Sequence, residues 1–259
     1  MNVAGFDRAW WPLSAMLSLA LVAWLVSLKL RDVSIVDSLW SIFFIVFTLL
    51  FAWRMRSDTT AAFVLIALIL LWGFRLSAYI TIRNHGKGED RRYQAIRARN
   101  QPYFGFKSLY LIFMLQAVLA SIIVLPVVPI LNGARDANLL TYAGFAIAAF
   151  GAVFETVADA QMARYKATRT AQDTVMNRGL WRCSRHPNYF GEATFWWGLW
   201  IASASMGGAW TLFSPLLMTW LLTRVSGVPL LEADLQQRSP AYREYLTTTP
   251  RFVPGRPKR

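Results

Sequence analysis

Residues 34–53 read SIVDSLWSIFFIVFTLLFAW, an apolar run in which Asp37 is the only charged side chain. About 20 consecutive apolar residues in a helix are enough to cross the hydrocarbon core of a bilayer. The run therefore predicts a membrane-spanning helix with one carboxylate near its start. Because a charge in such a helix is costly, it marks a candidate functional site.

Six more runs of this kind predict six more spans. The seven predicted spans cover residues 11–28, 34–53, 60–82, 108–131, 139–161, 189–205 and 209–225. Composition agrees, since 56% of the 259 residues are hydrophobic and only 16% are charged, where a soluble domain carries about 25% charged residues. We therefore expect an all-α polytopic membrane protein, one integral-membrane domain over residues 1–259, whose last two spans form a hairpin around Met206-Gly207-Gly208.

The basic residues indicate the orientation of the chain. They gather in the segments after the third and fifth spans and in the C-terminal tail, while the opposite side offers only Arg8, Arg54, Arg56 and Arg135. The positive-inside rule places the basic segments in the cytoplasm. The sequence thus predicts an outside N-terminus and a cytoplasmic C-terminus, with a bacterial inner membrane as the expected location.

The net charge of +13 exceeds what topology requires. Several arginines around one pocket suit a polyphosphate, because guanidinium groups bind phosphate oxygens in bidentate fashion. The alternative is that they only set orientation and contact anionic lipid. Nucleic acid is not an expected partner, because the positive charges lie in short loops between apolar runs. A single cysteine, Cys183, and two distant histidines give no expected metal site.

Polar side chains inside the predicted spans form pairs four residues apart, which places each pair on one helix face. These pairs are Arg75 with Tyr79, Glu155 with Asp159, and Asn188 with Glu192. The last two pairs lie near the predicted cytoplasmic ends, where carboxylates and an amide suit the hydroxyls and amides of a nucleotide. For Asp37 the sequence leaves two interpretations open, a catalytic group or a structural ion pair with Arg75.

The second half of the chain carries a resemblance to a known family. Its motifs are Asp159-Ala-Gln161 with Tyr165-Lys166, Arg178-Gly179-Leu180-Trp181, Arg185-His186-Pro187-Asn188-Tyr189-Phe190-Gly191-Glu192, and a tail with Glu232, Tyr242, Tyr245 and Phe252-Val-Pro254. Together they resemble the steroid 5α-reductase family, most closely its bacterial branch. The resemblance is densest over residues 155–254.

This resemblance implies a seven-helix membrane reductase that binds NADPH in a cavity open to the cytoplasm. Hydride would pass to the β-carbon of an α,β-unsaturated ketone, a lipophilic substrate such as a 3-oxo-Δ4 steroid that enters from the membrane lipid. The expected cofactor-binding residues are Asp159, Arg164, Lys166, Arg178, Arg185, His186, Asn188, Tyr189, Glu192 and Glu232.

The expected catalytic residues are Asp37, Arg75 and Tyr79. Hydride addition to an enone develops negative charge on the carbonyl oxygen, so an acid or hydrogen-bond donor is needed nearby. The family uses a second-span glutamate and a third-span tyrosine for this purpose. Here the carboxylate is Asp37, and Trp72 stands at the tyrosine position, where an indole cannot protonate an enolate.

Two other classes of protein remain as alternatives. Arg-His-Pro before a helical hairpin, with Glu232 and the Tyr242–Tyr245 tail, also fits the isoprenylcysteine and phospholipid methyltransferases, which use S-adenosylmethionine. That cofactor has no phosphate and explains the surplus arginines less well. A transporter or lipid-binding scaffold would predict internal repeats, and the sequence has none that are visible.

Overall fold

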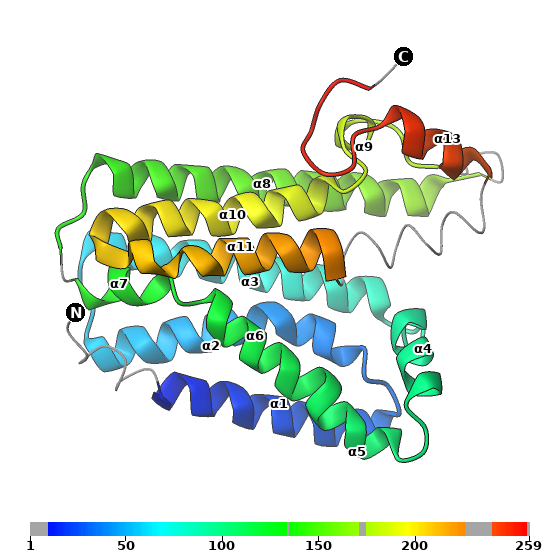
Figure 1. The fold of residues 1–259 in the computed structure, drawn as a ribbon, viewed down its shortest axis with the longest axis horizontal. Helices are drawn as coiled ribbons and strands as arrows, with labels where there is room; N and C mark the ends of the chain where they lie inside the picture. The colour runs from blue at the N-terminus through cyan, green and yellow to red at the C-terminus, as the bar shows by residue number, and fades with distance from the viewer. Residues whose placement is uncertain (1–9, 134, 171–174, 226–239, 258–259) are drawn as a thin grey trace. The chain divides into compact units, whose positions relative to one another are not determined.

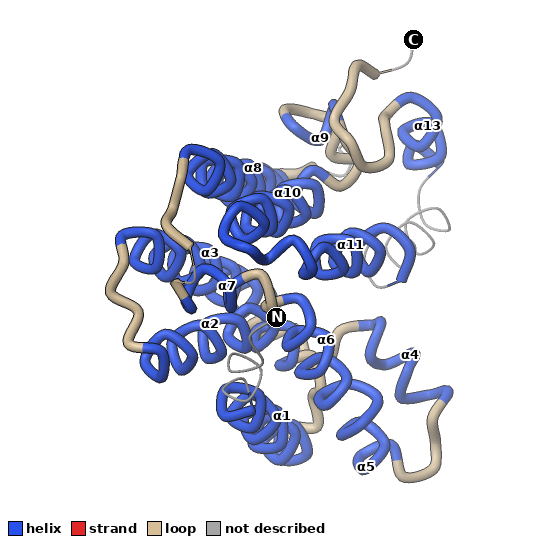
Figure 2. The backbone as a smooth tube through the Cα atoms, turned by 60° about the vertical axis from the view of Figure 1, so that its left-hand side comes forward, coloured by secondary structure: helices blue, strands red, loops and turns tan. Residues whose placement is uncertain are grey.

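The computed structural model describes residues 10–133, 135–170, 175–225 and 240–257, and this part of the chain contains helices and no strand (Figures 1 and 2). The chain divides into two compact units. Unit 1 takes Met1–Tyr142 with Ala202–Ser214, and unit 2 takes Ala143–Ile201 with Pro215–Arg259.

Five helices of the described chain are long and apolar enough to cross a membrane, which makes this an integral, multi-pass membrane protein. They are α1 (Trp10–Leu30), α2 (Ile35–Met55), α3 (Thr60–Asn84), a continuous segment over Phe104–Ile123, and α8 (Leu139–Thr168). The first, second, third and fifth predicted spans agree with these helices to within a few residues, except that α8 continues for two more turns.

The fourth predicted span is shorter than residues 108–131. It consists of α5 (Phe104–Ser108), the π-helix η2 (Leu109–Met114) and α6 (Leu115–Ile123), and a separate α7 (Val127–Asn132) follows. The break precedes Pro126, because proline lacks the N–H that a continuous helix needs and its ring clashes with the preceding turn.

The hairpin predicted for the last two spans is present. It runs through α10 (Pro187–Ser203), the π-helix η3 (Ala204–Gly208), the 3₁₀ turn η4 (Ala209–Leu212), α11 (Phe213–Trp220) and the π-helix η5 (Leu221–Val225). Gly207 reverses the chain with a φ of 94°, which a glycine adopts without strain. The Trp197 indole N–H donates to Thr219 Oγ1 at 3.1 Å and ties α10 to α11. Neither helix is among the five long ones, since α10 has 17 residues and α11 has 8.

Helix α2 is the centre of unit 1 and contacts α1, α3, α6 and α7 (Figure 1). Phe43, Phe44, Phe47 and Phe51 are buried along it. The short helix α4 (Arg91–Arg99) lies at the end of the unit where α3 ends and α2 begins. It starts at Asp90, whose side chain accepts the Arg92 backbone N–H at 2.9 Å in an N-cap.

In unit 2, α8 and α10 pack with their backbones in close approach. A Cβ added to Gly151 would lie 2.5 Å from the Phe195 backbone nitrogen, and one added to Gly191 would lie 2.6 Å from that of Glu155. Glycines at such contacts let membrane helices approach closely. The short α9 (Leu180–Cys183) and α13 (Pro240–Thr248) complete the described part of this unit.

Candidate functional site: two polar clusters

The first polar cluster surrounds Asp37 at the start of α2. Its Oδ2 accepts a hydrogen bond and ion pair from Arg92 Nη2 at 2.7 Å. Its Oδ1 accepts the Tyr93 hydroxyl proton at 2.5 Å, and Gln116 Nε2 donates to that hydroxyl oxygen at 3.2 Å. We call Asp37, Asp90, Arg92, Tyr93 and Gln116 the Asp37 cluster. Its carboxylate is held by α4 residues and not by Arg75, the partner that the sequence offered.

A set of loop contacts places α4 against the start of α2. Arg97 makes a bidentate ion pair with Glu89, at 2.8 and 2.6 Å, and its guanidinium lies 4.5 Å from the centroid of the Phe104 ring. Glu89 Oε1 accepts the Val33 backbone N–H at 3.1 Å, and Ser34 Oγ accepts that of Asp90 at 2.7 Å. Two hydrogen bonds therefore join the loop before α2 to the loop before α4.

Burial and charge act together on the groups that α4 contributes. Burial raises the pKa of Tyr93 well above its usual value, and the negative charge and hydrogen bond of Asp37 raise it further. For Arg92, burial lowers the pKa, but Asp37 and Asp90 outweigh that effect and the net shift is upward. Arg92 is thus a permanent cation, and Tyr93 holds its proton at neutral pH.

The predicted catalytic residues of α3 lie on the stretch of that helix that packs along α2, where Ser77 Oγ donates to the Ser38 carbonyl at 2.8 Å. Arg75 and Tyr79 are half-buried one turn apart, and the Arg83 guanidinium lies 5.9 Å from the centroid of the Tyr79 ring. Trp72 is a core residue, 2% exposed, whose ring lies 5.7 Å from that of Phe44. The side chain at position 72, where the resemblance to steroid 5α-reductases expects a tyrosine, therefore packs against α2.

The second polar cluster lies in unit 2, where α8 faces α10. Glu155 and Asp159 of α8 and Glu192 of α10 are buried, and Asn188 Nδ2 donates to Asp159 Oδ1 at 3.3 Å. The close approach at Gly191 brings the Glu155 backbone against the turn that precedes Glu192. The two helices thus bring together the four residues that the sequence placed in two pairs; we call them the carboxylate cluster.

The segment between Arg178 and His186 is clamped to its surroundings by hydrogen bonds. Gly179 has a φ of 58°, and an added Cβ would lie 2.6 Å from Gln161 Oε1, so only glycine fits this turn. Gln161 Oε1 accepts the Leu180 backbone N–H at 2.9 Å, and the Trp181 indole donates to the Ala158 carbonyl at 2.9 Å. This segment is therefore attached to the end of α8.

Two predicted cofactor ligands, Arg185 and His186, are buried beside the C-terminal segment. Arg185 donates from Nη1 to the Leu246 carbonyl at 2.7 Å and from its backbone to the Pro250 carbonyl at 2.9 Å. The His186 ring is stacked on Tyr189, with 5.6 Å between centroids. The Arg185 contacts fasten the C-terminal segment, and the His186 contact lies within the motif itself.

The remaining predicted cofactor cations lie on the surface of unit 2. Arg164 and Lys166, in the last turns of α8, and Arg178, before α9, are exposed. Glu232 lies outside the described residues. Within the described residues, His, Cys, Asp and Glu form no group of three that would hold a metal ion.

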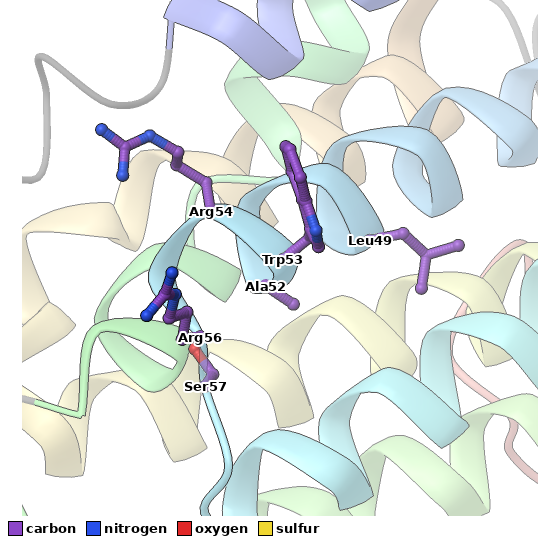
Figure 3. Close-up of a pocket in the computed structure, with 6 residues that line it drawn as sticks. All are labelled: Leu49, Ala52, Trp53, Arg54, Arg56 and Ser57. Atoms are coloured by element: carbon purple, nitrogen blue, oxygen red, sulfur yellow. The ribbon is translucent and has the colours of Figure 1, made fainter.

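One cavity in unit 1 lies far from the Asp37 cluster. It has a volume of about 550 Å³ and is lined by Leu49, Ala52, Trp53, Arg54, Arg56 and Ser57 at the end of α2 (Figure 3). At 1.5 Å per residue, Trp53 is about 24 Å along the helix from Asp37. A smaller cavity of about 260 Å³, in the loop between α3 and α4, includes Asp90 and thus borders the Asp37 cluster.

Sequence reasoning missed Arg92, Tyr93 and Gln116. Arg92 was counted only among the residues that set topology, and Gln116 lies within an otherwise apolar run. Tyr93 carried a usable signal, since it is an aromatic residue with a titratable hydroxyl and follows Glu89-Asp90 in a segment between two predicted spans.

Comparison with known protein families gives one match. The family model described as a protein of unknown function, DUF1295, matches residues 23–249. Comparisons with curated proteins and with solved structures found no match. The matched range includes the Asp37 cluster, the carboxylate cluster and most of the chain, and the protein therefore belongs to the DUF1295 family.

Proposed function

We propose that this protein is a membrane-embedded, NADPH-dependent reductase that saturates the C=C bond of an α,β-unsaturated ketone in a lipophilic substrate such as a 3-oxo-Δ4 steroid. The observation that carries the proposal is the Asp37–Tyr93 pair, a tyrosine hydroxyl in a 2.5 Å hydrogen bond to a carboxylate. The resemblance of the chain to steroid 5α-reductases supports it, since that family uses a carboxylate and a tyrosine.

The pair can perform the acid step of such a reaction. Both Asp37 oxygens accept hydrogen bonds, one from Arg92 and one from Tyr93, so the proton available for transfer is that of the tyrosine. Tyr93 would donate it as negative charge develops on the substrate oxygen, and the resulting phenolate would recover a proton from water. Asp37, which Arg92 holds through its other oxygen, orients the hydroxyl.

The carboxylate cluster and the nearby cations fit a dinucleotide. Buried carboxylates and the Asn188 amide suit the hydroxyl and amide donors of a nucleotide, and exposed Arg164, Lys166 and Arg178 suit its phosphates. Bound NADPH would supply the hydride. Arg185 would support this site through the C-terminal segment that it fastens.

We also propose the finer membrane arrangement. All seven predicted spans would cross the bilayer, with α10 and α11 crossing as a hairpin. The N-terminus would be outside and the C-terminus cytoplasmic, in a bacterial inner membrane. The basic segments after α3 and α8 would then lie on the cytoplasmic side, where NADPH is available.

Ligand stabilisation of the purified protein in detergent tests the proposal. A ligand that binds only the folded state raises the melting temperature, and we expect NADPH to do so more strongly than NADH. Consumption of NADPH with a panel of enones then tests the reaction. Stabilisation by S-adenosylmethionine and not by NADPH would overturn the proposal in favour of a methyltransferase.

Tyr93→Phe tests the acid. We expect it to reduce enone turnover by about 100-fold, within the range contributed by a general acid, and to leave stabilisation by NADPH unchanged. Tyr110→Phe is a matched control. It also removes one tyrosine hydroxyl in unit 1, but at a residue that is 59% exposed. Equal turnover in the Tyr93→Phe and control variants would exclude Tyr93 as the proton donor.

A further inference from the structure

Gln116 belongs to the Asp37 cluster and contacts the proposed proton donor, but it has no part in the reaction proposed above. It lies on α6, two residues after the π-helix η2 ends. Its Nε2 donates to the Tyr93 hydroxyl at 3.2 Å. Polar residues are rare in an apolar segment of this kind, and there they face the interior of the protein.

The hydrogen bonds of the cluster determine which way the amide of Gln116 points. A tyrosine hydroxyl has one proton to donate and can accept a further hydrogen bond. The Tyr93 hydroxyl donates its hydrogen bond to Asp37 Oδ1, so toward Gln116 it can act only as an acceptor. The N–H side of the amide must therefore face Tyr93, and the carbonyl Oε1 must point away from it.

Oε1 is buried and has no hydrogen-bond partner among the described residues. A side chain kept only for structure has both ends of its amide satisfied, because a buried polar atom without a partner is costly. Gln116 satisfies its N–H through Tyr93 and leaves its acceptor unused. This arrangement favours a role in which the hydrogen bond from the N–H to the Tyr93 hydroxyl is what matters.

The π-helix before Gln116 affects which face of α6 the residue occupies. A π turn accommodates one residue more than an α turn, and one residue corresponds to about 100° of rotation. The register of α6 relative to α5 therefore depends on η2. Single π turns of this kind occur frequently at functional sites.

We propose that Gln116 is a positioning residue for the proton donor: its side-chain N–H orients the Tyr93 hydroxyl toward Asp37 and stabilises the phenolate that forms when Tyr93 gives up its proton. This role rests on the proposed reductase function, in which Tyr93 is the acid. A hydrogen bond to the charged form of an acid favours ionisation. Gln116 thereby opposes the effect of burial and of Asp37, which both raise the pKa of Tyr93.

The test measures the pKa of the phenol at position 93 directly. The full-length protein carries 3,5-difluorotyrosine at position 93, whose phenol is more acidic than that of tyrosine, and ¹⁹F NMR in detergent follows its ionisation. Asp37 of α2 and Arg92 of α4 face the ring and remain in place. We expect Gln116→Met, which keeps the side-chain length without the N–H, to raise the titration midpoint by about one pH unit, a tenfold loss of acidity.

Gln94→Met is the matched control. Gln94 makes a similar amide hydrogen bond, from Nε2 to the Glu89 carbonyl at 2.7 Å, but it is exposed on α4 and its amide donates there and not to the Tyr93 hydroxyl. We expect its midpoint to equal that of the parent protein. A midpoint that stays unchanged or falls in Gln116→Met would overturn the proposal, and this result does not depend on any enzymatic activity.

A double-mutant cycle on enone turnover adds the link to catalysis. We expect Gln116→Met to reduce kcat by about 10-fold or more, as for loss of a hydrogen bond to a charged group, with the KM for NADPH unchanged. In the Tyr93→Phe background the same change should have no further effect. An equal loss in both backgrounds would show that Gln116 does not act through Tyr93. If the wild-type protein shows no enone turnover, the proposed reductase function is refuted. The NMR titration would then still test whether Gln116 lowers the pKa of the hydroxyl at position 93.

Discussion

Replacing Gly191 with alanine tests whether the close contact between α8 and α10 builds the carboxylate cluster. The added Cβ would lie 2.6 Å from the Glu155 backbone nitrogen and 2.8 Å from both the Glu155 Cβ and the Gly151 carbonyl oxygen. Two of these three atoms belong to the backbone and cannot rotate away. Ordinary contact begins at 3.4 Å, so the two helices must separate by about 0.8 Å at this point.

That separation has an energetic and a functional consequence. Overpacking of this kind costs about 1–3 kcal/mol, which for a chain of this size lowers the melting temperature by about 2–12 °C. The hydrogen bond from Asn188 Nδ2 to Asp159 Oδ1 is already 3.3 Å long, and a further 0.8 Å breaks it. We therefore expect Gly191→Ala to weaken NADPH stabilisation as well as the fold, measured by thermal unfolding in detergent with and without NADPH.

Gly105→Ala provides the control for this prediction. Gly105 is also helical, but its added Cβ would meet only the Leu28 Cδ2 methyl, at 3.3 Å, and a side-chain end can move. Alanine is favoured over glycine in a helix by up to about 1 kcal/mol, so the melting temperature should stay the same or rise. A Gly191→Ala protein as stable as the parent, with full NADPH stabilisation, would refute the packing argument.

Three further predictions concern single side chains. Burial raises the pKa of Glu89, but Arg97 outweighs this effect and holds the pKa below its usual 4.5. The ion pair therefore stabilises the fold fully above pH 4.5 and loses its effect as the pH falls through the lowered pKa. Between pH 7 and pH 3 the melting temperature should fall more steeply in the parent protein than in Glu89→Gln, and parallel curves would contradict this. Asn188→Ala or Glu192→Ala should remove stabilisation by NADPH without preventing membrane insertion, and the assignment of the motif fails if both variants bind NADPH normally. Asp37→Asn should reduce enone turnover while sparing NADPH binding, whereas unchanged turnover would exclude Asp37 from the acid step.

The membrane helices were predictable because each depends on a local pattern. The start of α3 agrees with the sequence, since Thr59 caps it by accepting the Ala62 backbone N–H at 3.2 Å. The fourth span was predicted too long, because hydropathy continues through Pro126 while backbone hydrogen bonding does not. The four residues of the carboxylate cluster were predicted as two pairs, each on one helix face. Neither the hydrogen bond between Asn188 and Asp159 nor the glycine contact that brings the two helices together was foreseen.

The partners of Asp37 were not predictable in this way. Arg92 and Tyr93 are 55 and 56 residues away along the chain, and their placement depends on two loops joined by Glu89 and Ser34. Spacing rules relate residues within a helix and give no information on such long-range contacts. Arg75 was the only cation inside a neighbouring predicted span, so it was the one partner that the sequence could offer as an alternative, whereas Asp37 forms its ion pair with Arg92.

The placement of Tyr93 also bears on the substitution at position 72. A tryptophan at the position where the resemblance to steroid 5α-reductases expects a tyrosine argues against the proposed reaction only if the hydroxyl must come from α3. In this chain Trp72 packs on Phe44, while the hydroxyl that reaches the α2 carboxylate comes from α4. Under the proposed function, the carboxylate and the phenol are both retained and only the helix that carries the phenol differs. The chemistry then depends on the loop contacts that hold α4, which is why Glu89 and Arg97, remote from any substrate, belong among the residues to test.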